Sequence, residues 1–319
     1  MKPIILLTFL LISVKIFSQN DTTVIINDSE LKASGEDLQT PKVFYGQRLI
    51  NANTVEVLRK GVMEFRVSHN FDDIGGDNGK LKNFFGLDNS TDVRIGFQLG
   101  VVKDFNILAS HSKDQYWELG GKYQLLHQDL NKSPFSLTAF ASIVSSSRRL
   151  AHDNNGLVPG TETSYQTTSD RFSQAYQLML ARHLGAVSLQ FNPTFVHRNF
   201  VVQGDDNSIF ALGGALRIPI TKGFILIADY FHPFRSERSK NFYADTTGGK
   251  KAIKFYDPIG IGFEFITRGH VFHLNFTNSR EILEPRFISN TTSSWGKGQF
   301  RWAFNFSRNF TVFRDKKNK

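Results

Sequence analysis

The chain of 319 residues contains no cysteine. This absence excludes disulfide bonds, thiol catalysis, cysteine-ligated metals and lipid attachment through a cysteine. Acidic side chains are also in short supply, because 29 Asp and Glu face 38 Lys and Arg, which gives a formal charge of +9. No nucleic-acid-binding module accompanies this excess, so we expect no nucleic-acid partner. The excess of positive charge favours anionic lipid headgroups or anionic solutes as partners. The alternative, that the excess is ordinary surface charge without a specific partner, remains open.

Long apolar runs are equally scarce. Residues 3–14 form one, behind Lys2 and ahead of Ser18 and Gln19. A basic start, a short apolar core and a small residue before polar sequence are typical of a secretory signal peptide, so we expect cleavage after Ser18. The remaining sequence has no apolar run long enough for a membrane-spanning helix, which excludes an inner-membrane helical protein.

Where apolar residues do occur, they alternate with polar ones. In the segment 260–278, Phe263 and Phe265 alternate with Gly262 and Glu264. Successive side chains of a β-strand point to opposite faces, so such a segment has one apolar and one polar face. The same period recurs at 62–68, 93–101, 117–125 and 300–307. Because the mean hydropathy is −0.26 despite 31 Phe, the composition suits a barrel with an apolar outside and a polar inside.

The connections between these segments differ in length in a regular way. Short turns near residues 103, 185, 222 and 268 alternate with long polar loops such as 72–89, 148–170, 236–251 and 279–297. Transmembrane barrels have short periplasmic turns and long extracellular loops, whereas a soluble sandwich has no reason for this segregation. The sequence therefore predicts an all-β, antiparallel, up-and-down transmembrane β-barrel of about 12 strands.

We expect four parts along the chain. They are a signal peptide at 1–18, a polar N-terminal periplasmic extension at 19–60, the β-barrel at 61–313 and a basic C-terminal tail at 314–319. The sequence leaves open whether the extension plugs the barrel. Trp117, Tyr123, Tyr230 and Trp302 are candidates for the aromatic girdles of a membrane barrel. Pro193 lies inside an expected strand and predicts a bulge or a strand end, because proline cannot donate to the ladder.

Several blocks of sequence resemble a known family. They lie at 51–54, 60–69, 85–89, 193–199, 269–280 and 295–298, within a stretch from about residue 43 to 313. These blocks resemble the uncharacterised Gram-negative β-barrel family known as domain of unknown function 5777. The resemblance implies an outer-membrane barrel without an assigned function and supplies no catalytic residues. It also implies the usual surroundings of such a barrel, namely outer-membrane lipids, lipopolysaccharide and the barrel-insertion machinery.

The polar faces of the expected strands supply candidate lumen residues. A barrel interior holds polar side chains because water or partners satisfy them there. Two interpretations remain open: a charged lining that selects a solute, or a paired network that closes the lumen. The candidates are Glu64, Arg66, Arg94, Gln98, Glu118, Lys122, Arg217, Asp229, Glu264, His273 and Arg301.

Three functions follow, in order of preference. The first is passage or binding of a small, anionic solute by an outer-membrane barrel. The second is a structural or interaction barrel with an occluded lumen, whose extracellular loops bind a partner. The third is an outer-membrane hydrolase, for which His69 and His197 are candidates, but neither has the spacing of a base oriented by a third group. We therefore expect no enzyme activity, no cofactor and no metal site.

Overall fold

The computed structural model describes residues 42–313, apart from 77–78, 114, 130–132, 149–151, 154–155, 158–164, 166, 222, 248–251 and 268–269. The expected signal peptide, residues 19–41 of the expected extension and the basic tail lie outside the described residues. Within the described residues, no helix has the length and apolar character needed to cross a membrane.

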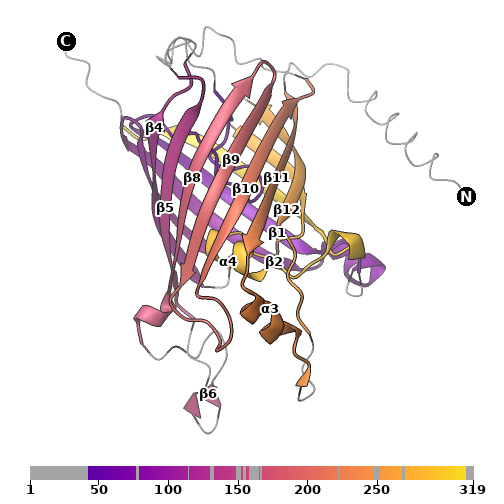
Figure 1. Ribbon diagram of the computed structural model, residues 1–319. Helices are drawn as coiled ribbons and strands as arrows, with labels where there is room; N and C mark the ends of the chain where they lie inside the picture. The colour runs from indigo at the N-terminus through magenta and orange to yellow at the C-terminus, as the bar shows by residue number, and fades with distance from the viewer. Residues whose placement is uncertain are drawn as a thin grey trace, which may run out of the picture. The chain divides into compact units, whose positions relative to one another are not determined.

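Twelve antiparallel strands close into a barrel, as the alternation predicts (Figure 1). The first and last strands complete the ring, because β1 pairs with β14 in a register that sets Ser68 opposite Asn305. The strands are β1 (Val62–Asp73), β2 (Ser90–Val102), β3 (Phe105–Ser112), β4 (Tyr116–Leu126), β5 (Ser136–Ser146), β8 (Phe172–Leu184), β9 (Val187–Arg198), β10 (Ser208–Pro219), β11 (Phe224–Phe234), β12 (Ile259–Thr267), β13 (His270–Thr277) and β14 (Arg301–Thr311).

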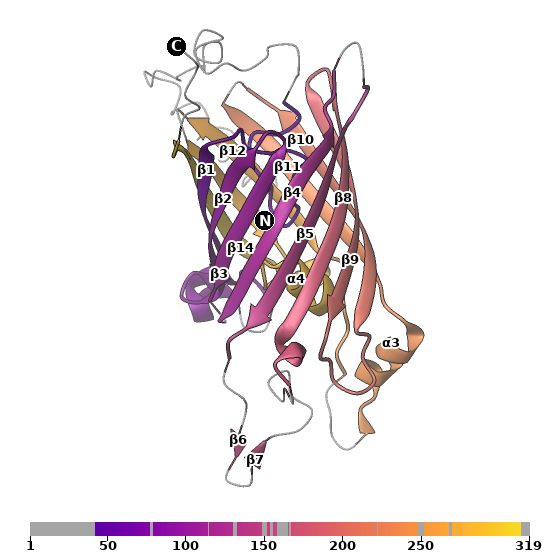
Figure 2. The ribbon, with the colours of Figure 1, turned by 90° about the vertical axis from the view of Figure 1, so that its left-hand side faces the viewer.

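The two ends of the barrel carry different connections. Tight connections join β2 to β3, β8 to β9, β10 to β11 and β12 to β13 at one end, which we call the short-turn end. The opposite, long-loop end carries the short strands β6 (His152–Asp153) and β7 (Gly156–Leu157) and the helix α3 (Glu237–Ala244) (Figure 2). It also carries η1 (Lys80–Gly86), η2 (Ser169–Arg171), α4 (Glu284–Asn290) and η4 (Trp295–Lys297). The connection from β3 to β4 is a short one at this end.

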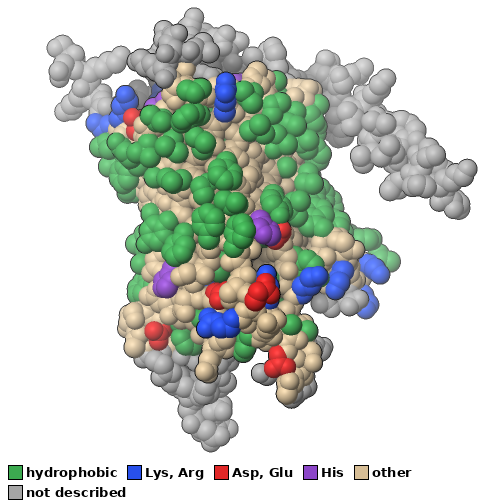
Figure 3. Space-filling model, in the orientation of Figure 1, with side chains coloured by type: hydrophobic (Ala, Val, Ile, Leu, Met, Phe, Trp, Pro, Cys, Tyr) green, Lys and Arg blue, Asp and Glu red, His purple; other side chains and the backbone are tan. Residues whose placement is uncertain are grey.

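Burial follows the two-residue period, with apolar residues outward. On β2, Ile95 and Phe97 are 47% and 46% exposed, whereas Arg94 is 2% exposed. Apolar side chains cover much of the outer surface in Figure 3. This inverts the arrangement of a water-soluble protein and matches a lipid-facing exterior. Three of the girdle candidates, Trp117, Tyr123 and Tyr230, are also exposed.

The expectation for Pro193 is wrong. Pro193 lies inside β9, opposite Leu212 of β10, and the strand continues to Arg198. The register with β8 is the same on both sides of it, since Gln177 pairs with Thr194 and Leu180 with Phe191. The strand therefore accommodates the proline without a bulge.

Candidate functional site

The interior of the barrel holds a chain segment from outside the strand pattern. We call residues 42–60 the plug segment; it precedes β1 and starts from the short-turn end. Its centre is a tight hairpin in which Arg48 and Asn53 form a β-bridge and the Leu49 amide donates to the Ala52 carbonyl at 2.9 Å. Most of its side chains between Val43 and Val55 are buried. This stretch belongs to the region that the sequence analysis assigns to a periplasmic extension.

Side chains from eight strands hydrogen-bond to the plug segment. They come from every part of the ring: β2, β4, β5, β8, β9, β11, β13 and β14. Most of these bonds join a barrel side chain to the plug backbone, as where Lys122 Nζ donates to the carbonyls of Gln47 at 2.7 Å and Thr54 at 3.0 Å. The eight side chains are Gln98, Lys122, Thr138, Gln177, Gln190, Asp229, His273 and Asn305. The plug segment is therefore fixed from all sides.

Asp229 makes the most contacts of this kind. Its carboxylate accepts from the backbone amides of Ile50 at 3.2 Å, Asn51 at 2.6 Å and Ala52 at 2.8 Å. It also accepts from the side-chain amide of Asn51 at 2.9 Å. Because one carboxylate accepts all four of these bonds, Asp229 anchors the hairpin tip.

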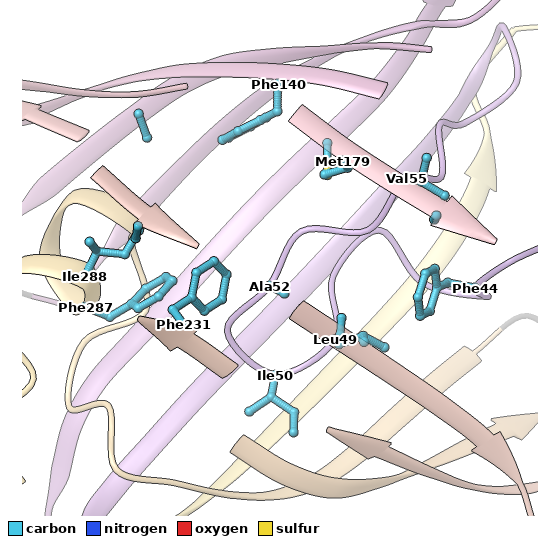
Figure 4. Close-up of a cluster of buried hydrophobic side chains, with 14 of the residues drawn as sticks. Phe44, Leu49, Ile50, Ala52, Val55, Phe140, Met179, Phe231, Phe287 and Ile288 are labelled. Atoms are coloured by element: carbon cyan, nitrogen blue, oxygen red, sulfur yellow. The ribbon is translucent and has the colours of Figure 1, made fainter. Parts of the chain in front are cut away.

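The helix α4 enters the barrel from the long-loop end and meets the plug segment. Glu284 at its start forms an ion pair with Arg48 at 2.7 Å and accepts from the Asn53 amide at 2.8 Å. Phe287 of α4 packs edge-on against Phe231 of β11, with ring centroids 5.2 Å apart. Figure 4 shows these rings in one apolar cluster with Leu49, Ile50 and Val55 of the plug segment. Two insertions from opposite ends thus fill the middle of the barrel.

All eleven predicted lumen residues are buried in the barrel. Three sets pair with one another: Glu64 with Arg66 at 3.1 Å, Arg94 with Glu118 at 2.7 Å, and Glu264 with both Arg217 at 2.9 Å and His273 at 3.2 Å. Gln98, Lys122, Asp229 and His273 bind the plug segment. Arg301 pairs with Asp73 and donates to the Asn278 carbonyl at 2.7 Å.

Little free space remains beside these pairs. A cavity lined by Arg48, Arg66, Arg94 and Gln98, among others, has a volume of about 10 Å³. This is about the volume that one water molecule needs. The charged side chains around this cavity therefore leave space for about one water molecule between them.

The sequence did not reveal three interior residues that lie outside the strands, namely Arg48, Asn53 and Glu284, which contact one another inside the barrel. Arg48 and Asn53 lie in the plug segment, and Glu284 lies in the loop between β13 and β14. None of these segments shows strand alternation, so the pattern that finds lumen residues does not reach them. The block at 51–54 was the available signal, since it stands out in a region assigned to a polar extension.

A second site lies at the long-loop end, between η2, α3, α4 and the ends of β8 and β9. It is a cavity of about 50 Å³, which exceeds the volume needed by a single water. Three arginines contribute to its lining: Arg171, Arg198 and Arg286. Five aromatic rings do so as well, from Tyr116, Tyr165, Phe172, Phe200 and Tyr243. We call this site the rim pocket.

The guanidinium groups of the rim pocket lie close to its rings. Arg171 lies 5.1 Å from the ring centre of Tyr165, and Arg286 lies 4.7 Å from that of Tyr116. Tyr165 itself packs edge-on against Phe200 at 5.6 Å. Such groups recognise anions and flat rings, because a guanidinium binds carboxylate or phosphate and an aromatic face stacks.

One carboxylate organises the floor of the rim pocket. Asp205 pairs with Arg198 at 2.9 Å and with Arg235, and it accepts from the Tyr243 hydroxyl at 3.0 Å. Burial alone raises the pKa of Asp205, but Arg198, the Ser239 hydroxyl and Arg235 together hold that pKa below its ordinary value. Burial and the nearby Asp205 charge raise the pKa of Tyr243 to about 12. The group is therefore a network of ionised Asp205 and neutral Tyr243 at neutral pH.

The two histidines weighed for hydrolysis lie on different sides of the barrel. His69 of β1 stacks on Phe304 with ring centroids 5.2 Å apart. His197 of β9 contacts Ser208 through Nδ1 at 2.8 Å. Five strands separate β1 from β9 around the ring, so the two histidines do not form one site. Among the described residues, no group of three or more His, Cys, Asp or Glu side chains is arranged to hold a metal ion.

The chain was compared with protein families, curated proteins and solved structures. A family model described as a membrane bound beta barrel domain, DUF5777, matches residues 44–310. No curated protein matches the chain. Among solved structures, the COG4313 outer membrane channel from Pseudomonas putida F1 is similar with 10% identity and a TM-score of 0.47, covering 80% of this chain and 98% of that chain.

Two porins are similar to a comparable degree. The NanC porin has 7% identity and a TM-score of 0.45, covering 79% of this chain and 100% of that chain. The KdgM porin has 9% identity and a TM-score of 0.45, covering 78% of this chain and 99% of that chain. All three solved structures are membrane channels in name, and at this identity the likeness concerns the fold.

Proposed function

Because the chain belongs to the DUF5777 family of membrane-bound β-barrel domains, we propose that it is a closed barrel that binds a small anionic solute at its long-loop end. The protein is an outer-membrane β-barrel, which agrees with the apolar exterior and the closed ring of strands.

The plug segment carries the proposal. Its hydrogen bonds to eight strands cross the whole section of the barrel, and α4 closes the same section from the other end. Because these bonds share one short hairpin, a solute could pass only if that hairpin were displaced. We therefore assign the charged interior to holding the plug segment and not to selecting ions.

The rim pocket supplies the chemistry of the solute. Asp170 and Asp205 also line the pocket, and Arg198 and Arg286 are ion-paired with Asp205 and Glu281. Arg171, which donates to the backbone carbonyls of Ser146 and Arg148, is therefore the guanidinium that favours a carboxylate or phosphate on the ligand. The five aromatic rings favour a ring on the same ligand, as in a sugar acid. A volume of about 50 Å³ admits the charged group, and the ring of the ligand would lie against the aromatic side chains of the lining. Binding here needs no catalytic group and no cofactor.

Gated passage is the second candidate. It is favoured by the nature of the bonds to the plug segment, since many are polar bonds that water could replace one for one. In this case the rim pocket would collect the solute, and release of the plug segment would open the lumen. The two candidates differ in one observable, the conductance of the intact protein.

Conductance in planar bilayers tests the proposal. We expect no conductance from the intact, folded barrel. We expect conducting steps from an Asp229→Asn variant, because the side-chain amide places N–H groups against the backbone N–H donors of residues 50–52. Asp257→Asn serves as the control, since Asp257 is partly exposed and bonds to Tyr230 and His232 outside the lumen. Steady conductance from the unaltered protein would favour gated passage instead.

Titration calorimetry tests the solute. We expect glucuronate to bind the folded protein and neutral glucose not to bind. Arg171→Gln should weaken glucuronate binding, whereas Lys240→Gln, which removes one positive charge from the exposed side of α3, should leave it unchanged. Equal loss in both variants would point to diffuse charge attraction and would contradict the rim pocket as the site.

A further inference from the structure

The loop between β1 and β2 reverses the usual placement of polar and apolar residues. We call residues 79–89, which contain η1, the η1 loop. Its large apolar side chains are exposed: Leu81 by 79%, Phe84 by 60%, Phe85 by 44% and Leu87 by 43%. Its buried members include the polar Asn83 and Gly86. A loop in contact with water would place these residues the other way round.

The backbone of the η1 loop is fixed in this reversed arrangement. Phe84 and Phe85 have φ of 48° and 55°, in the left-handed region that phenylalanine rarely adopts. Such backbone persists only where the surrounding structure determines it. Here the Asn83 side chain accepts from the Gly86 amide at 2.9 Å, and the Asp88 amide donates to the Asn83 carbonyl at 3.3 Å.

Neighbouring backbone leaves no room for a side chain at position 86. A Cβ atom there would lie 2.3 Å from the Asp72 carbonyl oxygen at the end of β1. The Lys80 amide also donates to the Ile74 carbonyl at 2.8 Å. The exposed phenylalanines are thus held outward by polar contacts beneath them, at a conformational cost that a simple connecting loop would not need.

The η1 loop continues the lipid-facing surface of the barrel. It extends sideways from the ends of β1 and β2 in Figures 1 and 2 and does not cover the mouth of the barrel. Aromatic side chains cluster on the neighbouring strands, as where Phe71 lies 6.1 Å from Phe304 and Phe276 lies 4.5 Å from Trp302. Rings at this level form the girdle of a membrane barrel. Lys80 and Lys82 are exposed beside Leu81 and add positive charge at the same level.

We propose that the η1 loop is an interfacial anchor that binds anionic lipid at the long-loop face of the membrane. Leu81, Phe84 and Phe85 enter the boundary between headgroups and acyl chains, and Lys80 and Lys82 contact the headgroup phosphates. Apolar side chains flanked by lysine are the pattern of segments that lie in this boundary. The inference is independent of the solute proposed above, because the η1 loop shares no residue with the rim pocket.

The absence of native cysteine allows a direct test in the full-length protein. A nitroxide label is introduced by Leu81→Cys, and its collision rates with oxygen and with a water-soluble nickel complex give its depth in proteoliposomes. Ile95→Cys, on the outer face of β2, is the reference for lipid, and Lys240→Cys, exposed on α3, is the reference for water. Vesicles of phosphatidylcholine are compared with vesicles that also contain phosphatidylglycerol.

We expect the label at position 81 to meet the nickel complex several-fold less often than the label at position 240. Adding Lys80→Gln and Lys82→Gln should make the label shallower in the anionic vesicles and leave it unchanged in the neutral ones. Nickel accessibility equal to that at position 240 in both vesicles would overturn the anchor. A deep label that ignores both lysines and the lipid charge would overturn the recognition of anionic headgroups.

Discussion

The plug segment meets two different inner walls. On one side, β10 and β11 present mainly apolar residues, and the plug segment packs Leu49 and Ile50 into a cluster with Ile225 and Ile227. On the other side, β1 to β4 present charged and amide side chains, which pair with one another and with plug residues such as Gln47. Apolar packing is non-directional, whereas a buried ion pair depends on both partners and their geometry. The wall of β1 to β4 therefore holds the plug segment by directional polar contacts. The wall of β10 and β11 holds it mainly by apolar packing and, at the hairpin tip, by the bonds of Asp229.

Removing one charge from the charged wall should have the largest effect. Glu118→Gln leaves the Arg94 guanidinium buried without its carboxylate, and we expect a loss of about 3–5 kcal/mol in the free energy of unfolding. Urea unfolding of the protein in lipid vesicles measures it. Glu237→Gln is the matched control, because Glu237 is exposed on α3, and its effect should stay within about 0.5 kcal/mol.

The packing of the plug segment against the apolar wall should tolerate changes of side-chain shape but not of side-chain volume. Leu49→Ala removes a fully buried side chain and should cost about 3 kcal/mol, whereas Leu49→Met should cost less than about 1.5 kcal/mol. Arg94→Lys gives the corresponding conservative change on the charged wall. It should not be tolerated equally well, because lysine cannot reproduce the bonds of Arg94 to both Ser110 and Glu118. Equal tolerance at positions 49 and 94 would break the distinction between the walls.

A glycine on β12 sets how closely the plug segment approaches the barrel. A Cβ atom at Gly260 would lie 2.7 Å from Ile50 Cγ2 and 2.9 Å from an Asp229 carboxylate oxygen. Gly260→Ala should therefore displace the hairpin tip and cost about 1–3 kcal/mol, with faster proteolysis of the plug segment. Gly214→Ala in β10 is the control, since its Cβ would meet its nearest atom at 3.7 Å. Equal proteolysis of both variants would show that the tip has room to move.

The smallest effect concerns pH and lies outside both walls. The pKa of Asp205 is held below its ordinary value, so its pairing stabilises the fold fully above about pH 4, the pKa of an unfolded aspartate. This contribution is lost as the pH falls through the lower, folded-state pKa. Unfolding midpoints between neutral and strongly acidic pH should show a smaller acid-induced loss in Asp205→Asn than in the unaltered protein. An identical acid profile in both would exclude Asp205 as its source.

The strands were predictable because each obeys one local rule. Alternation over 93–101 separates outward Ile95 from inward Arg94, and the same rule yields the twelve strands and every buried candidate. The plug segment was not predictable in this way. Its residues are fixed by partners that lie far away in the sequence, as Asn51 is by Asp229, and no local period records such a pairing. The reversed exposure of the η1 loop likewise depends on the neighbouring strands.

The contact of Asn53 with Glu284 has a consequence for the order of assembly. These residues are 231 positions apart, and Glu284 lies in the connection between the last two strands. Contacts between distant parts of a chain form late, because the entropy of closing a long loop must first be overcome. The interior can therefore reach its final state only after the final hairpin has been made, which couples a sealed lumen to a completed ring. A barrel in which the final hairpin has not formed therefore keeps an open lumen. A protease that enters this lumen would cleave the incomplete barrel and not the completed one.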